Sequence, residues 1–179
     1  MSRLLRPFRT LPARGLLLAL ALGFGLLGPA ARAEEVSEYS MKAVLFYRLA
    51  QFVYWPGGET APKPTILCVV GKNPFGPAIN QLKQAGDGTE LRIAPADPGA
   101  CHLLFIARSE SASLDSWLSR SEGRRMVTIS DIPGFAKAGG MIELPLDGER
   151  VGILINRASA AKKGIDFNAQ LLRLAKVVP

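Results

Sequence analysis

The residues best suited to chemistry are His102, the single histidine of the chain, and the neighbouring pair Ser130-Asp131. A serine hydrolase needs a hydroxyl nucleophile, a histidine base and an orienting carboxylate. Ser130-Asp131 follows an apolar run, at the strand end where open parallel sheets place their sites. The sequence has no Gly-x-Ser-x-Gly nucleophile elbow, however. We therefore interpret His102 as a buried, hydrogen-bonded histidine and predict no catalytic residue.

The two cysteines, Cys68 and Cys101, are too far apart in the sequence for a zinc motif. With one histidine they predict no metal site, and no other pattern predicts a cofactor. Both cysteines lie on or beside apolar runs that we expect to be neighbouring strands. In an oxidising compartment we expect a Cys68–Cys101 disulfide, which would contribute roughly 3–4 kcal/mol in the chain-entropy interpretation. The alternative is a pair of buried thiols that pack as small apolar groups.

A glycine-rich loop at 132–140 follows Ser130-Asp131 and is too rich in glycine and proline to be helical. We interpret this loop and the two residues before it as a candidate binding site. The candidate residues are Ser130, Asp131, Phe135, Gly139 and Gly140. A structural interpretation stays open, in which the glycines supply backbone freedom and the aspartate caps the loop.

The elements that must position these residues follow from apolar periodicity. Apolar residues at spacings of three and four predict a helix over 36–55, with Lys42 off the apolar stripe. Its aromatic end, including Tyr54 and Trp55, is interpreted either as core packing or as part of a partner surface. Further helices are predicted over 75–84, 113–121, 156–163 and 168–177. Strands are predicted over 65–71, 90–94, 102–107, 126–129, 141–146 and 151–155.

Strands that alternate with short helices predict an α/β fold. We expect a three-layer sandwich with a mostly parallel sheet and helices on both faces. The dipeptide Asp147-Gly148 separates the last two strands and predicts a C-terminal antiparallel hairpin at the sheet edge. The length from 34 to 179 suits one domain.

Residues 1–33 have the pattern of a secretory signal peptide. Four arginines precede an apolar run at 16–27, which is short for a membrane span, and Ala31-Arg32-Ala33 offers small residues to a signal peptidase. We predict export to the periplasm with cleavage before Glu34, and an uncleaved anchor is the alternative. The net charge of +7 includes five arginines of this segment, so residues 34–179 carry only +2. Nucleic-acid binding is therefore not predicted.

Many short motifs recur together in the order of a known family. They are Tyr39-Ser40-Met41-Lys42-Ala43, Phe52-Val53-Tyr54-Trp55-Pro56, Leu67-Cys68-Val69, Asn73-Pro74-Phe75-Gly76, Cys101-His102-Leu103-Leu104-Phe105-Ile106, Ser109-Glu110, Thr128-Ile129-Ser130-Asp131, Gly134-Phe135, Gly139-Gly140-Met141-Ile142, Ile155-Asn156, Ala160-Ala161, Gly164 and Gln170-Leu171-Leu172-Arg173-Leu174-Ala175. Taken together they resemble the YfiR family of periplasmic regulators.

This resemblance implies a non-catalytic exported domain. Its best-known members restrain an inner-membrane diguanylate cyclase from the periplasmic side, which lowers cyclic di-GMP and biofilm formation. The resemblance also implies an outer-membrane lipoprotein that sequesters the regulator, and homodimers. Members of that system can carry a second cysteine pair near the final hairpin, whereas residues 141–156 contain no cysteine here. The alternative hypotheses are a periplasmic small-ligand-binding accessory protein of a transport or two-component system, and an exported hydrolase.

Overall fold

The structure is a computed structural model that describes residues 30–57, 61–82 and 88–179, with side chains from residue 38 onward. Contacts divide the chain into two units, Met1–Ala33 and Glu34–Pro179, and the second unit carries the α/β fold. The predicted signal peptide falls almost entirely on residues outside the described ranges. Among the described residues, no helix has the length and apolar content needed to span a bilayer.

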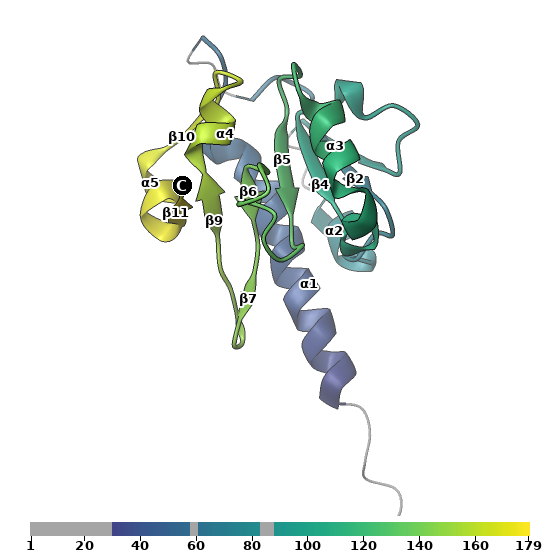
Figure 1. Cartoon of the computed structure of the whole chain (residues 1–179). Coiled ribbons are helices and arrows are strands. Elements are labelled where there is room, and N and C mark those ends of the chain that lie inside the picture. Colours follow the sequence, from purple (N-terminus) through teal and green to yellow (C-terminus); the bar gives the residue numbers. More distant parts are fainter. Residues whose placement is uncertain (1–29, 58–60, 83–87) are drawn as a thin grey trace, which may run out of the picture. The chain divides into compact units, whose positions relative to one another are not determined.

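The helices of the described part vary from a long first helix to short capped turns (Figure 1). They are α1 (Ala30–Leu49), α2 (Pro77–Leu82), α3 (Leu114–Ser121), α4 (Arg157–Ala161) and α5 (Ala169–Leu174), with 3-10 turns at Ala50–Phe52, Pro98–Ala100 and Arg108–Ser113. The strands are β1 (Val53–Tyr54), β2 (Thr65–Val70), β3 (Thr89–Ile93), β4 (Leu103–Ile106), β5 (Val127–Ser130), β6 (Ile142–Glu143), β7 (Leu146–Asp147), β8 (Arg150–Val151), β9 (Leu154–Asn156), β10 (Asp166–Phe167) and β11 (Lys176–Val178).

The main sheet of the described part has seven strands in the order β11-β9-β6-β5-β4-β2-β3. Strands β2 to β6 pair in parallel, β9 is antiparallel to β6, and β11 is parallel to β9. The chain leaves β2 for β3 on one side and then crosses to β4 on the other. This reversal makes the carboxyl ends of β2 and β4 the topological switch point, where open α/β sheets bind ligands.

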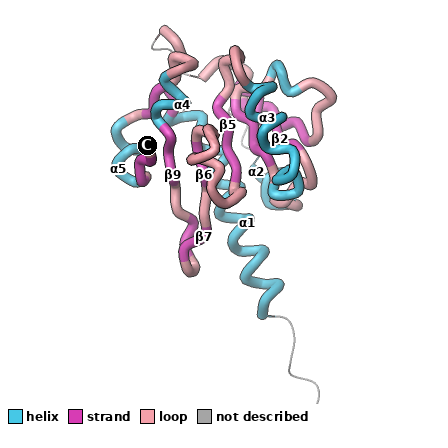
Figure 2. The backbone as a smooth tube through the Cα atoms, in the orientation of Figure 1, coloured by secondary structure: helices cyan, strands magenta, loops and turns pink. Residues whose placement is uncertain are grey.

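Both faces of the sheet are buried, because successive side chains of each strand point to opposite faces. Leu67 and Val69 of β2 belong to one apolar cluster, together with residues of α1, whereas Cys68 and Val70 belong to a second cluster packed on α3. Figure 2 shows the helices on the two sides of the strands. The predicted three-layer α/β sandwich with a mostly parallel sheet is confirmed.

The first helix ends earlier than predicted, at Leu49 instead of Trp55. A 3-10 turn follows, and Val53-Tyr54 then form β1, which pairs antiparallel with β10. β-branched and aromatic residues favour strands, and Pro56 disfavours helical geometry at Trp55. The second helix begins later than predicted, at Pro77 instead of Phe75. The reason is that Gly76 has a φ of +53°, which is not a helical conformation. Residues 83–84 of that prediction lie outside the described residues.

The C-terminal part differs from the prediction in two respects. First, the hairpin turn is Gly148-Glu149, one residue later than predicted, with Gly148 at a φ of +61°. Its arms β7 and β8 form a separate ribbon that projects beyond the main sheet (Figure 1). Second, the last helix ends at Leu174, and residues 176–178 form β11, which makes the sheet edge outside β9. The antiparallel pair β6–β9 is therefore internal.

Candidate functional site

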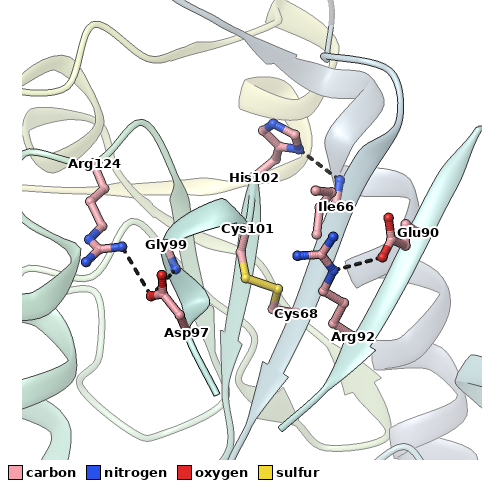
Figure 3. Close-up of a disulfide and its surroundings, with 9 residues drawn as sticks. All are labelled: Ile66, Cys68, Glu90, Arg92, Asp97, Gly99, Cys101, His102 and Arg124. Atoms are coloured by element: carbon pink, nitrogen blue, oxygen red, sulfur yellow. Dashed lines mark hydrogen bonds and ion pairs between the residues drawn. A yellow bond between two sulfur atoms is a disulfide. The ribbon is translucent and has the colours of Figure 1, made fainter. Parts of the chain in front are cut away.

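The predicted disulfide joins the middle of β2 to the segment just before β4 (Figure 3). Cys68 of β2 and Cys101, two residues before β4, are joined with their Cα atoms 5.8 Å apart. β2 and β4 are paired neighbours with Cys68 opposite Leu104, so the chain that leads into β4 passes beside β2 and brings Cys101 close to Cys68. The disulfide prediction is confirmed, and the bond links strands on the two sides of the switch point.

His102 follows the disulfide and is hydrogen-bonded, as predicted, although it is half-buried rather than buried. Its Nδ1 accepts a hydrogen bond from the backbone N–H of Ile66 at 2.8 Å (Figure 3). Its ring meets the Trp55 ring edge-on, with the centroids 5.8 Å apart. Burial, and secondarily the positive charge of Arg92, lowers the pKa of His102. The neutral histidine therefore serves as a fixed acceptor.

The structure separates His102 from Ser130. Ser130 pairs with Ile106, four residues further along β4, so roughly 13 Å of strand lies between the two side chains. The Ser130 hydroxyl is fully buried, donates to the Ile106 carbonyl at 2.7 Å and accepts from the Ile132 N–H at 3.0 Å. The Ser130–His102 pair that the hydrolase hypothesis needs is not assembled, and Ser130 holds the chain at the end of β5.

Asp131, immediately after β5, is the centre of a buried ion network. Its Oδ2 accepts hydrogen bonds from Lys42 Nζ at 2.9 Å and Tyr39 Oη at 3.0 Å, both from α1. Arg108, in the 3-10 turn after β4, brings its Nε to 3.1 Å from the same oxygen and also donates to the Asp131 carbonyl. Lys42 is fully buried and also pairs with Glu38 one turn earlier. Asp131 thus ties α1 to the carboxyl ends of two strands.

The electrostatics of this network favour a protonated tyrosine. Burial, followed by the charge of Asp131, raises the pKa of Tyr39 to about 12, so its hydroxyl remains a donor at neutral pH. The second carboxylate oxygen of Asp131, Oδ1, is buried and has no hydrogen-bond partner among the described residues. Within the described part of the chain, three side chains therefore contact Oδ2 of Asp131, and no hydrogen-bond donor contacts Oδ1.

Two buried side chains of the sheet hold the loop after Asp131 through hydrogen bonds to its backbone. Glu143 of β6 accepts the backbone N–H groups of Gly134 and Ala136, each at 3.0 Å. Asn156 donates from Nδ2 to the Ala136 carbonyl at 2.8 Å, and its Oδ1 caps α4 at the Ser159 N–H. Buried charge-assisted hydrogen bonds of this kind order a loop strongly. The loop is consequently part of the scaffold.

Several predicted surface candidates lie in the interior, which corrects their interpretation as contact residues. Phe135 is fully buried, and its ring packs against Gly140, where a Cβ atom would lie 2.1 Å from the ring. Trp55 is only 5% exposed. Phe135 and Trp55 each belong to one of the two apolar clusters of the core, so apolar burial decides their position. Tyr54, at 50% exposure, and Gly139 are exposed.

The sequence analysis missed Tyr39, Lys42 and Arg108 as partners of Asp131. A signal existed for Lys42, which stands three residues after Tyr39 and four before Phe46 and so shares the buried face of α1. Arg108 carried no comparable signal, because only the pairing of β4 with β5 brings it to Asp131.

Two solved structures share the fold at 11% sequence identity. One is the ABC domain in complex with L-Trp from Streptococcus pneumonia, with a TM-score of 0.53. The other is a conserved domain protein from Vibrio cholerae O1 biovar El Tor strain N16961, with a TM-score of 0.57. Each match covers 79% of this chain and 60% of the other, so this chain spans about 60% of the length of these relatives.

A search of curated proteins found no significant match. The sequence profile of the YfiR/HmsC-like family, in contrast, matches residues 39–176. The matched region begins at Tyr39, includes Lys42, Arg108 and Asp131, and ends at the first residue of β11. It therefore spans the sheet up to the first residue of β11, and the buried network apart from Glu38. The chain belongs to the YfiR/HmsC-like family.

Proposed function

We propose that this protein is a periplasmic regulator that binds and represses an inner-membrane diguanylate cyclase, and so lowers cyclic di-GMP and biofilm formation. The observation that carries the proposal is the family match over residues 39–176, which supports a periplasmic regulator of diguanylate cyclases in general. The particular cyclase, an outer-membrane lipoprotein that sequesters the regulator, and a homodimer are finer parts of the same proposal.

Export is supported by two features of the chain. The signal-like segment 1–33 precedes the domain, and the Cys68–Cys101 disulfide fits an oxidising compartment. We expect N-terminal sequencing of the protein isolated from the periplasm to begin at Glu34. An intact Met1 on the exported protein would contradict cleavage.

A regulator that acts by occupancy needs an exposed contact surface. The described part offers Met41 and Val44, which lie three residues apart on α1 and are both exposed, and Tyr54 on β1. Residues three apart are neighbours on a helix surface, so Met41 and Val44 form one apolar patch. We propose this patch and Tyr54 as contacts to the partner, because exposed apolar and aromatic side chains anchor interfaces.

The test is capture of the partner from solubilised membranes with the tagged exported protein, followed by mass spectrometry. The wild-type protein should capture a membrane diguanylate cyclase, and M41S/V44S or Y54A should reduce the captured amount about tenfold, since interface anchors contribute 1–2 kcal/mol or more. The matched control is L174A, because Leu174 is also apolar and is 73% exposed at the far end of the chain. Equal capture by all variants would refute this contact surface.

A small-ligand-binding protein is the second candidate function, favoured by a cleft of about 590 Å³ at the carboxyl ends of β2 and β4. In the same capture experiment, a transporter permease or a sensor kinase in place of a cyclase would favour this second candidate.

A further inference from the structure

The cleft occupies the topological switch point of the sheet. It is lined by the segment that follows β2, by residues that follow β4, by the middle of α1 and by α2. The lining residues are Tyr39, Ser40, Lys72, Asn73, Pro74, Phe75, Gly76, Pro77, Ala78, Gln81, Arg108 and Ser109. Its volume of about 590 Å³ falls within the usual range of small-molecule sites, roughly 300–1,000 Å³. The crevice between β2 and β4 is also where flavodoxin-like sheets, with this strand order, bind their ligands.

The charged groups of the cleft are both basic. Lys72 and Arg108 line it, and no carboxylate belongs to its described lining. Three described acids next to lining residues in sequence or contact already have partners. Asp131 is contacted by side chains of α1 and of the turn after β4, Glu38 pairs with Lys42, and Glu110 accepts a hydrogen bond from Trp117 at 2.8 Å. Lys72 forms no ion pair with any described residue, so its charge is free to meet a ligand.

Arg108 is held in a geometry that leaves part of its guanidinium free. The side chain is 48% exposed, and its hydrogen bonds to Asp131 all come from Nε. Arg108 lines the cleft, and these Nε contacts do not use its two terminal nitrogens, whose four N–H donors have the planar arrangement that matches a carboxylate. Asp131 thus positions the arginine through Nε and does not occupy its terminal donors.

Part of the remaining lining is apolar and rigid, whereas uncharged polar groups come from Tyr39, Ser40, Asn73, Gln81 and Ser109. Pro74, Pro77 and Ala78 line one side, next to the buried Phe75, whose ring stacks on Phe46 of α1 with the centroids 5.8 Å apart. Two prolines and a packed ring lose little conformational freedom when a ligand binds. A small molecule with an apolar body and one anionic end therefore fits this cleft better than a fully polar ion.

We propose that the cleft binds a small organic carboxylate, with its carboxylate on Arg108 and Lys72 and its apolar body against Pro74, Pro77 and Ala78. The proposal does not depend on a cyclase partner. Because Arg108 and Tyr39 both contact Asp131, the ligand joins the same network that holds α1, the helix that carries the proposed contact patch.

The test uses isothermal titration calorimetry with the full exported protein, at constant ionic strength set with sodium chloride. The probes are benzoate, its neutral isostere benzamide, and inorganic phosphate. Benzoate should bind in a saturable manner, and benzamide should bind at least about tenfold more weakly, because the charge-assisted hydrogen bonds to arginine are lost. Phosphate should also be weaker than benzoate, because it has no apolar body.

Substitutions of the two basic residues test whether benzoate binds in this cleft. K72Q removes an exposed charge that forms no ion pair within the described part of the chain, so the fold should be unchanged while benzoate binding weakens about tenfold. R108Q should weaken it further. The matched control K176Q removes an exposed lysine on β11, far along the sheet, and should leave binding unchanged.

Saturable benzoate binding that K72Q reduces and K176Q preserves supports the proposal. The proposal is overturned if benzoate and benzamide bind equally, if neither is bound up to about 10 mM, if phosphate binds as tightly as benzoate, or if K72Q binds like the wild type. Capture of a cyclase by the same protein stays an independent result, so failure here does not refute the proposed function.

Discussion

Replacement of Lys42 by methionine should destabilise the protein strongly, because Lys42 is the buried cation of the Asp131 network. Methionine has nearly the length of lysine, so K42M removes the charge without opening a large cavity. Removal of one partner from a buried ion pair typically costs 3–5 kcal/mol. Arg108 and Tyr39 still contact Asp131 in K42M, so we expect the lower end, a loss of about 3 kcal/mol in the free energy of unfolding.

The assay is equilibrium unfolding in urea, followed by far-UV circular dichroism on oxidised protein purified from the periplasm. The matched control is K137M, because Lys137 is an exposed lysine on the loop that follows Asp131. We expect K137M to stay within about 0.5 kcal/mol of the wild type, as is usual for surface substitutions. The loss of unfolding free energy in the double variant K42M/D131N should be smaller than the sum of the losses in K42M and D131N, by roughly 1–3 kcal/mol.

Equal unfolding free energies of K42M and K137M would refute the network as a stabilising centre. Strict additivity in K42M/D131N would refute the direct Lys42–Asp131 interaction at 2.9 Å, even if both single variants were unstable.

Three further predictions concern the rest of the fold. C68A/C101A should lower the unfolding free energy by about 3–4 kcal/mol because the disulfide closes a 33-residue separation; an unchanged urea midpoint would contradict this. Because the pKa of His102 is lowered in the folded state, the unfolded state takes up the histidine proton at a higher pH than the folded state does. The free energy of unfolding should therefore be constant in this respect above about pH 6.5 and fall as the pH drops below it. H102N keeps an acceptor for Ile66 and should flatten this part of the pH profile, and an identical slope would count against the assignment. F135A should cost about 3–5 kcal/mol as a cavity in a fully buried site, measured by the same urea assay, whereas a surface role would leave stability nearly constant.

The parallel core could be predicted because its strands are buried on both faces. Runs such as 66–70 and 103–106 are continuously apolar, and a short apolar run between turn signals has few alternatives in an α/β chain. The predicted starts of two helices, at 156 and 168, coincide with asparagines whose side chains accept the backbone N–H three residues later, at 2.9 Å and 2.8 Å.

The remaining elements depend on partners distant in the sequence. β1 and β11 have only two and three residues, and each exists because a strand elsewhere offers an unpaired edge. The candidate loop was located correctly, but its burial was not, because Glu143 and Asn156 draw it inward through backbone groups that leave no sequence pattern. The Asp131 network was missed because its partners are distant in the sequence: 89 residues separate Asp131 from Lys42.

The most direct test of the proposed function measures cyclic di-GMP in the source bacterium. Deletion of the gene should raise cyclic di-GMP, and the full-length gene should restore the original level. A gene that encodes only residues 34–179, without the signal-like segment, should fail to restore it, because the protein would not reach the periplasm. Unchanged cyclic di-GMP after deletion, in cells that contain a membrane diguanylate cyclase, would contradict the proposed function.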